Sequence, residues 1–197
     1  MFPVIATGLG IEWMHQLICF GDSITAGWNG EKDTPRLTDR LVSGLNCQVR
    51  NAGVSGETTD QAVRRLDHDV LDLPYDKVTV LFGANDSSFH KGIPLTRFIR
   101  NLDRIVRAIS PDKVILMTPS PVIDARQIGK RTNERVSLYA QAVRTCARSH
   151  GAVLIDLNRE MAGKDNYEPL LLADGLHFSD AGYDFLAGLM VNKLKDN

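Results

Sequence analysis

The chain is organised around the stretch Leu17-Ile18-Cys19-Phe20-Gly21-Asp22-Ser23-Ile24-Thr25. Its first half is a short apolar run, which is typical of a fully buried strand in a parallel sheet. Its second half is a small, polar turn that carries Ser23. Ligands bind at the carboxyl ends of the strands in open parallel sheets, so Ser23 is expected at such an edge. The alternative is that Asp22 and Ser23 are ordinary turn and helix-cap residues.

Apolar runs of the same kind alternate with segments of helical periodicity along the rest of the chain. Further strands are predicted over residues 47–51, 77–82, 114–117 and 152–157. Helices are predicted over residues 35–45, 59–71, 94–109, 133–150 and 180–194, and residues 158–178 are expected to form a long connection. Strands that alternate with helices of this length indicate repeated βαβ units and a parallel sheet covered on both faces, which is an α/β fold.

The length of 197 residues predicts one domain with a substantial core. No internal repeat, low-complexity tract or linker divides the chain, so residues 16–197 are expected to form a single domain. Residues 1–15 are interpreted as an N-terminal arm or a cloning remnant. Glu12 and His15 interrupt the apolar part of this arm well short of a membrane span. The arm also lacks the basic region of a signal peptide, so none is predicted.

Charge and cysteine content narrow the classes of partner. The net charge is −1 and no run of basic residues occurs, so neither nucleic acid nor an anionic membrane is an expected partner. Cys19, Cys47 and Cys146 are interpreted as reduced thiols, which favours a cytoplasmic protein. They lack the spacing of a zinc site, and no metal is proposed. The oligomeric state is not predicted.

Polar turns that follow predicted strands bring together the groups that acyl transfer requires. Such a reaction needs a nucleophile, a base, a carboxylate that orients the base, and donors for the oxyanion. Ser23 is the candidate nucleophile, His177 the base, and Asp174 the carboxylate three residues before it. Gly53 can offer a backbone N–H at close approach, and Asn85 can offer its side-chain amide. Parallel strands place their carboxyl ends at one edge, so these turns should converge.

Four blocks of the sequence together resemble the SGNH hydrolases, also called the GDSL esterase/lipase family. In order they read Gly21-Asp22-Ser23-Ile24-Thr25, Asn51-Ala52-Gly53-Val54-Ser55-Gly56, Gly83-Ala84-Asn85-Asp86 and Asp174-Gly175-Leu176-His177. The resemblance covers residues 17–190. Ile24 replaces the Leu of the family name. Thr25 replaces the second Gly of a Gly-x-Ser-x-Gly elbow, which argues against an ordinary α/β-hydrolase.

The resemblance implies both a fold and an activity. The fold is a three-layer α/β/α sandwich with a mostly parallel, flavodoxin-like sheet of five strands. The activity is that of a serine esterase without a cofactor, with Ser23, His177 and Asp174 as the catalytic residues. The implied oxyanion hole consists of the Ser23 N–H, the Gly53 N–H and the Asn85 side chain. The wording of the last two blocks is most similar to the small-ester branch, such as the isoamyl-acetate-hydrolysing esterases.

The segments Thr118–Thr132 and Asn158–Phe178 are the sizeable insertions and are expected to form a shallow groove. The apolar residues expected to line it are Pro121, Val122, Ile123, Leu170, Leu171 and Leu172. Such a groove favours hydrolysis of small carboxylic esters with acyl chains from acetyl to butyryl through an acyl-enzyme. Trp28 is a candidate either for the wall of the acyl site or for loop packing.

Other readings remain open at this point. A thioesterase or a lysophospholipase would use the same serine, histidine and aspartate with a different pocket. A metal-dependent phosphoesterase would use Asp22, Asp86, Asp174 and His177 as ligands, although hard metals usually require more carboxylates than these turns supply. A flavodoxin-like module could instead bind phosphate at its glycine-rich turns. Asp22 and Asp86 are more simply interpreted as residues that hold their turns by hydrogen bonds to the backbone.

Overall fold

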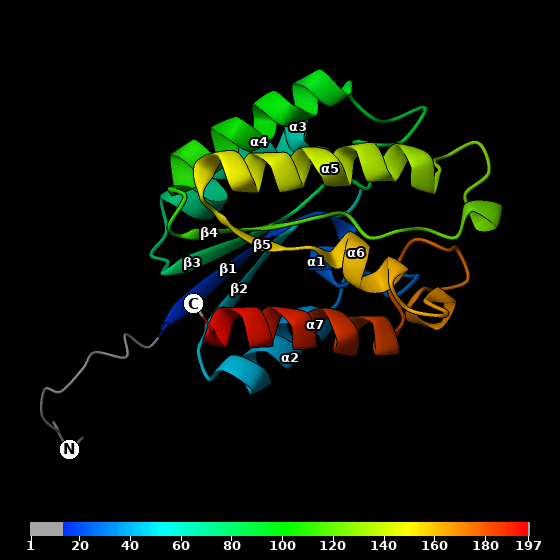
Figure 1. The fold of residues 1–197 in the computed structure, drawn as a ribbon. Helices are drawn as coiled ribbons and strands as arrows, with labels where there is room; N and C mark the ends of the chain where they lie inside the picture. The colour runs from blue at the N-terminus through cyan, green and yellow to red at the C-terminus, as the bar shows by residue number, and fades with distance from the viewer. Residues whose placement is uncertain (1–13, 197) are drawn as a thin grey trace, which may run out of the picture.

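The structure, a computed structural model, describes residues 14–196, so most of the expected N-terminal arm lies outside the described residues. Within them a parallel sheet of five strands forms the middle layer (Figure 1). Its strands are β1 (Gln16–Gly21), β2 (Gln48–Gly53), β3 (Lys77–Leu81), β4 (Val114–Met117) and β5 (Val153–Ile155). The spatial order β2-β1-β3-β4-β5 is that of the flavodoxin-like fold, which confirms the predicted class.

Helices cover both faces of this sheet (Figure 1). One face carries α3 (Thr59–Leu66), α4 (Leu95–Ile109) and α5 (Asn133–His150). The other carries α1 (Ser23–Ala26), α2 (Arg36–Leu45), α6 (Leu157–Ala162) and α7 (Asp180–Lys195). A π-helical turn (Asp67–Leu71) and two 3-10 turns (Asp124–Arg126 and Glu168–Leu170) complete the regular structure. The result is the predicted three-layer sandwich.

The apolar run of β1 explains its place inside the sheet. Successive side chains of a strand point to opposite faces. Ile18 and Phe20 accordingly pack in the core beneath α3, α4 and α5, while Leu17 and Cys19 pack in the core beneath α2 and α7. All four side chains are almost completely inaccessible to solvent. A strand that is buried on both faces needs apolar side chains at every position. This is why residues 17–20 do not alternate between apolar and polar side chains.

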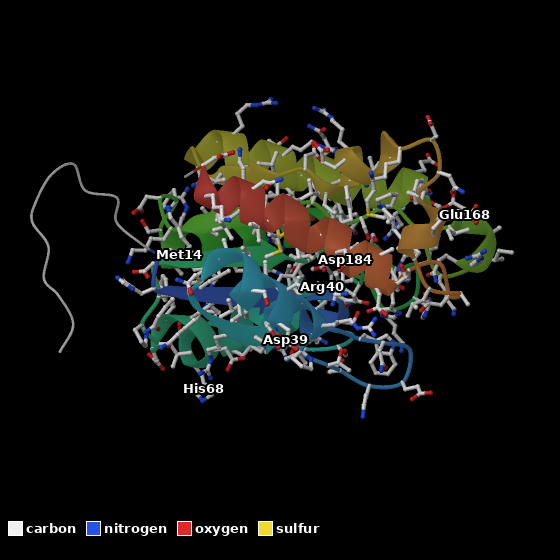
Figure 2. All side chains as sticks on the ribbon, turned by 90° about the horizontal axis from the view of Figure 1, so that it is seen from below. Met14, Asp39, Arg40, His68, Glu168 and Asp184 are labelled. Carbon is white, nitrogen blue, oxygen red and sulfur yellow. The ribbon has the colours of Figure 1, made fainter. Side chains whose placement is uncertain are left out.

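Helix α7 packs beside α2 and also reaches the first turn after β1. Figure 2 shows Arg40 of α2 close to Asp184 of α7, and the Arg40 Nε donates to the Asp184 Oδ1 over 2.6 Å. The Asp184 carboxylate is largely exposed, so this pair contributes little stability. The buried Tyr183 matters more, because its hydroxyl donates to the Ile24 carbonyl over 3.0 Å. Helix α7 thereby fixes the position of α1, which begins with Ser23.

Three details differ from the prediction. Two residues counted within the expected arm contact the domain, since Met14 packs against the core and the His15 N–H donates to Asp76. The helix predicted over 59–71 changes to a π-helical turn at Asp67. The connection after β5 contains α6, a helix too short to show a hydrophobic period. No helix within residues 14–196 is both long and apolar enough to span a bilayer.

Candidate active site

Ser23 occupies the first position of α1, immediately after the carboxyl end of β1. The Asp22 carboxylate caps this helix, because its Oδ1 accepts the Ile24 N–H over 3.0 Å. Gly27 ends the helix after one turn with a φ of 84°, in the left-handed region that glycine adopts readily. The sharp strand-to-helix turn therefore holds Ser23 at the edge of the sheet where ligands bind in such folds.

The structure brings Ser23, His177 and Asp174 into one chain of hydrogen bonds. The Ser23 Oγ lies 3.0 Å from the His177 Nε2, and the His177 Nδ1 lies 2.5 Å from the Asp174 Oδ2. An ionised carboxylate can only accept, so the Nδ1 of neutral His177 carries the proton. The Nε2 is then free to accept the proton of the Ser23 hydroxyl. This is the geometry of a nucleophile, a base and an orienting carboxylate.

The turn that carries Asp174 and His177 is organised by the aspartate itself. Its Oδ1 accepts the N–H groups of Leu176 and His177 over 2.9 and 3.0 Å. Burial raises the pKa of Asp174, but the hydrogen bonds from the His177 ring and these two N–H groups outweigh it and lower that pKa well below its usual range. Asp174 is therefore ionised at neutral pH, as an orienting carboxylate must be.

Asn85 lies next to this group, at the turn that follows β3. Its Nδ2 donates to the Glu57 carbonyl over 2.9 Å and lies 3.4 Å from the Asp22 Oδ2. The second contact is long for an N–H···O hydrogen bond. One amide hydrogen of Asn85 is thus firmly held, while the other is weakly held beside the turn that carries Ser23. This placement agrees with the expectation that Asn85 lies at the same edge as Ser23.

The structure gives Gly53 a role other than the predicted oxyanion donor. Its N–H donates to the Asn51 Oδ1 over 2.9 Å and is therefore occupied. A Cβ at this position would lie 2.2 Å from the Ala26 backbone nitrogen. Gly53 consequently lets α1 pack closely against β2. The expectation that its N–H faces the reacting group is not supported by this geometry.

Gly56, three residues later, is a second glycine of the same block, which the sequence analysis did not single out. It has a φ of +82°, and apart from its own atoms and its two chain neighbours, no described atom lies within 4 Å of the position that a Cβ would occupy. Its N–H donates to no other residue in the described part of the chain. The neighbouring Glu57 carbonyl accepts the Asn85 amide, which places this turn beside Asn85. The block quoted for the resemblance contains both glycines, and only the fold tells them apart.

Asp22 and Asp86 hold their turns, as predicted from their positions. Asp86 accepts the Thr59 N–H and hydroxyl over 2.8 and 2.6 Å and the Gly83 N–H over 3.2 Å. Burial raises the pKa of Asp22 to about 7 and that of Asp86 to about 6, although backbone and side-chain donors oppose the increase. The two ring centroids of Trp28 and His177 are 5.9 Å apart, so Trp28 lies against the candidate base.

The apolar groove does not form as expected. Four of the six residues predicted to line it are buried, namely Pro121, Val122, Ile123 and Leu171. Only Leu170 and Leu172 remain partly accessible. The two insertions fold onto the domain, where Val122 packs with Ala84, Val136 and Leu176. They therefore offer less apolar surface to an acyl chain than the sequence suggested.

The metal-dependent alternative finds no donor set in the structure. Asp22 caps a helix, Asp86 holds a turn, and Asp174 is engaged with His177. Among residues 14–196, no three histidine, cysteine, aspartate or glutamate side chains form a group that could hold a metal ion. The four residues considered as ligands are thus used for other contacts.

Comparisons with known proteins agree with this geometry. The model of the GDSL-like lipase/acylhydrolase family matches residues 19–185. The chain is 34% identical to the isoamyl acetate-hydrolyzing esterase 1 homolog of Bos taurus, over 92% of this chain and 82% of that protein. It is 29% identical to the isoamyl acetate-hydrolyzing esterase of Saccharomyces cerevisiae, over 86% of this chain and 81% of that protein. These relatives match the branch to which the resemblance pointed.

Solved structures extend the likeness to the fold. The lipase/acylhydrolase of Enterococcus faecalis superposes with a TM-score of 0.88 at 34% identity, and the match covers 93% of this chain and 96% of that one. The acetylxylan esterase Axe2 of Geobacillus stearothermophilus has the same fold, with a TM-score of 0.77 at 23% identity over 91% and 94% of the two chains. The chain therefore belongs to the GDSL-like lipase/acylhydrolase family of carboxylic ester hydrolases.

Proposed function

We propose that this protein hydrolyses small carboxylic esters, with acyl chains from acetyl to butyryl, through an acyl-enzyme on Ser23. The observation that carries the proposal is the unbroken chain from the Ser23 Oγ through the His177 ring to the Asp174 carboxylate, with separations of 3.0 and 2.5 Å. This arrangement activates a hydroxyl for attack on a carbonyl carbon. The isoamyl acetate-hydrolyzing relatives support a small ester as the substrate.

The reaction would proceed in two steps, acylation of Ser23 and hydrolysis of the acyl-enzyme. The Ser23 Oγ bonds to the ester carbonyl carbon while its proton moves to the His177 Nε2. The bond to the alcohol oxygen then breaks, and the departing alcohol takes that proton. In the second step a water molecule gives a proton to the His177 Nε2 and attacks the acyl group. The carboxylic acid leaves as Ser23 regains its proton.

The oxyanion would be stabilised by donors on three turns. The Ser23 N–H belongs to the first turn of α1, where N–H groups have no intrahelical acceptor. The weakly held hydrogen of the Asn85 amide is a second donor. We assign the third to the Gly56 N–H in place of Gly53, because the Gly53 N–H is already engaged with Asn51. Donors aimed at developing charge usually provide the largest single contribution to such catalysis.

The location of the protein is proposed from its thiols. Cys19, Cys47 and Cys146 are all free, and burial raises the pKa of Cys19 to about 12 and that of Cys146 to about 11. Such thiols are unreactive, and unpaired cysteines are typical of a reducing compartment. This supports the cytoplasmic location expected from the sequence.

Hydrolysis of p-nitrophenyl acetate by Ser23→Ala and Ser43→Ala variants tests the proposal. Ser43 is an exposed serine on α2 and serves as the matched control. We expect the Ser23→Ala variant to lose activity while its circular dichroism spectrum and melting temperature stay close to those of the wild type. The Ser43→Ala variant should retain full activity. A Ser23→Ala protein that still hydrolyses the ester at the wild-type rate would refute the assignment of the nucleophile.

A further inference from the structure

Two buried polar side chains lie in the segment between β4 and α5, outside the four blocks of the family resemblance. Gln127 is 2% exposed and Arg131 is 7% exposed. Burial of an amide and especially of a guanidinium is costly unless both are hydrogen-bonded. The two side chains bond to each other, since the Arg131 Nη1 donates to the Gln127 Oε1 over 2.5 Å. We call this pair the Gln127–Arg131 link.

Each end of the Gln127–Arg131 link reaches a different turn of the candidate active site. The Gln127 Nε2 donates to the Asp174 backbone carbonyl over 2.7 Å. The Arg131 Nε donates to the Ala84 carbonyl over 3.0 Å, and Ala84 directly precedes Asn85. Three consecutive hydrogen bonds therefore join the turn that carries Asp174 and His177 to the turn that carries Asn85.

The backbone of the segment between β4 and α5 also forms hydrogen bonds near both turns, the one that carries His177 and the one that carries Asn85. The Ile123 N–H donates to the Gly175 carbonyl over 2.8 Å, inside the turn that carries His177. At the other end, the Lys130 carbonyl accepts the Phe89 N–H over 2.9 Å, shortly after Asn85. A Cβ on Gly175 would lie 2.9 Å from the Ile123 Cβ, so the segment and the turn are in close contact. The link is the side-chain part of a continuous contact between the two turns.

The positive charge of Arg131 interacts with carboxylates of the candidate active site. Burial lowers the pKa of Arg131, while its interactions with the carboxylates of Asp22 and Asp174 act in the opposite direction. A guanidinium stays protonated at neutral pH. The positive charge of Arg131 thus lies where two carboxylates of the site gather, and its forked donors fix a direction that a lysine ammonium does not.

We propose that Gln127 and Arg131 are positioning residues, which hold the base and its carboxylate at the correct distance from the oxyanion donor Asn85. This inference rests on the proposed esterase function. Among residues 14–196, the hydrogen bonds of the two side chains reach neither Ser23 nor His177, so their effect passes through the backbone at Asp174 and Ala84. Small displacements of catalytic groups cost large factors in rate. Loss of the link should therefore lower kcat and leave KM nearly unchanged.

The test measures kcat per active site in Gln127→Leu and Gln127→Glu variants with p-nitrophenyl acetate as substrate. A fluorophosphonate titrates the reactive serine and counts the competent sites. Gln127→Glu retains an acceptor for Arg131 but removes the donor to the Asp174 carbonyl. We expect kcat per site to fall about 10- to 100-fold in both variants, with KM changed by less than about threefold. The fall in kcat per site should be smaller in Arg131→Lys than in Arg131→Met. Lysine keeps the positive charge although it lacks the forked donors of the guanidinium, whereas methionine lacks both.

Gln141→Leu is the matched control, since Gln141 is an exposed glutamine on α5. A purely structural role would lower the melting temperature and the number of titrated sites, with kcat per site unchanged. That result, or wild-type kcat per site in Gln127→Glu, would overturn the positioning role alone. A wild-type protein that neither hydrolyses the ester nor takes up the fluorophosphonate would overturn the proposed function, and the positioning role with it.

Discussion

The amide of Asn85 is held in a way that leaves one hydrogen available. The Glu57 carbonyl takes one hydrogen over 2.9 Å, while the contact with the Asp22 carboxylate extends to 3.4 Å. The strong contact orients the side chain, and the weak one can be exchanged for an oxyanion at little cost. This division is what an oxyanion donor requires, because a donor fixed in advance needs no reorganisation during the reaction.

Replacement of Asn85 by alanine tests this role. We expect kcat to fall by about 10²–10³ with little change in KM, which is the usual effect of removing one oxyanion donor. Steady-state kinetics with p-nitrophenyl acetate give both constants. Asn192→Ala, on the exposed side of α7, should leave both unchanged. A change confined to KM would make Asn85 a residue for substrate binding or for turn structure.

A second prediction concerns Asp22 and the pH dependence of the free energy of unfolding. Burial raises its pKa from 3.8 to about 7 in the folded state, so the folded protein binds this proton more tightly than the unfolded chain does. The contribution of Asp22 to the free energy of unfolding is therefore greatest below pH 4 and decreases as the pH rises towards 7. Asp22→Asn carries no such charge. Relative to the wild type, this variant should become more stable by roughly 2–4 kcal/mol between pH 4.5 and pH 8.

Urea unfolding at these two pH values measures that difference. The exposed Asp165→Asn variant is the control and should show the same difference from the wild type at both. The absolute stability of Asp22→Asn also reflects its cap on the Ile24 N–H, so only the change with pH is diagnostic. The stability of Asp22→Asn relative to the wild type could instead be the same at both pH values, or be lower at pH 8. Either result would show that the charge on Asp22 does not destabilise the folded protein.

At the scale of elements, the position of α1 depends on a close approach to β2. A Cβ on Gly53 would lie 2.2 Å from the Ala26 nitrogen and 2.7 Å from the Thr25 carbonyl carbon, both of which are backbone atoms. Gly53→Ala should therefore displace α1 and Ser23 with it. We expect a loss of about 1–3 kcal/mol in the free energy of unfolding, as overpacking usually costs, together with a lower kcat.

Gly188→Ala provides the control for this substitution. Gly188 lies within α7, and no described atom outside the neighbouring turns of this helix lies within 4 Å of the position that a Cβ would occupy. Alanine there should leave activity unchanged and raise stability by up to about 1 kcal/mol. Thermal unfolding and steady-state kinetics compare the two variants directly. If Gly53→Ala were as stable and as active as Gly188→Ala, the close contact between α1 and β2 would be unimportant.

Most elements could be predicted from the sequence because they bury continuous or periodic apolar faces. Strand β4 has the predicted bounds of 114–117, and α5 begins at Asn133 as expected. The elements that escaped prediction are short. Helix α1 consists of one turn made by the Asp22 cap and the left-handed Gly27, and α6 spans six residues. Such elements are determined by local caps and tertiary contacts rather than by a hydrophobic period.

The site was predictable in part for a related reason. Ser23, Asn85, Asp174 and His177 follow strands or precede a helix, and the topology of a parallel sheet brings them to one edge. The choice between Gly53 and Gly56 depends on register, since Gly53 pairs with Gly21 inside the sheet. Gln127 and Arg131 lie in a segment without periodicity, and only the folded chain shows what they contact.

At the scale of the whole molecule, one sheet with an apolar core on each face supports the proposal that residues 16–197 form a single domain. The two insertions between its elements are folded against this domain, with Val122 and Leu171 buried. The buried side chains of these insertions cannot line a groove for an acyl chain, which agrees with the proposed preference for short acyl groups.

A series of p-nitrophenyl esters from acetate to palmitate tests the expected acyl preference. A buried methylene contributes about 0.8 kcal/mol, and one that finds no apolar wall contributes nothing. We expect kcat/KM to stay level or rise slightly up to butyrate and to fall for longer chains. A maximum at eight carbons or beyond would mean that the insertions open on binding. It would favour a thioesterase or lysophospholipase over a small-ester hydrolase.

The proposed esterase activity requires that His177 and Asp174 make Ser23 nucleophilic. The most direct measurement treats the protein with a fluorophosphonate and locates the adduct by peptide mass spectrometry. We expect one adduct per chain, on Ser23, with no adduct in the Ser23→Ala variant. Labelling should be strongly slowed in a folded His177→Ala variant. An unlabelled wild-type protein, an adduct on another serine, or labelling at an unchanged rate without His177 would refute the role of Ser23 as an activated nucleophile.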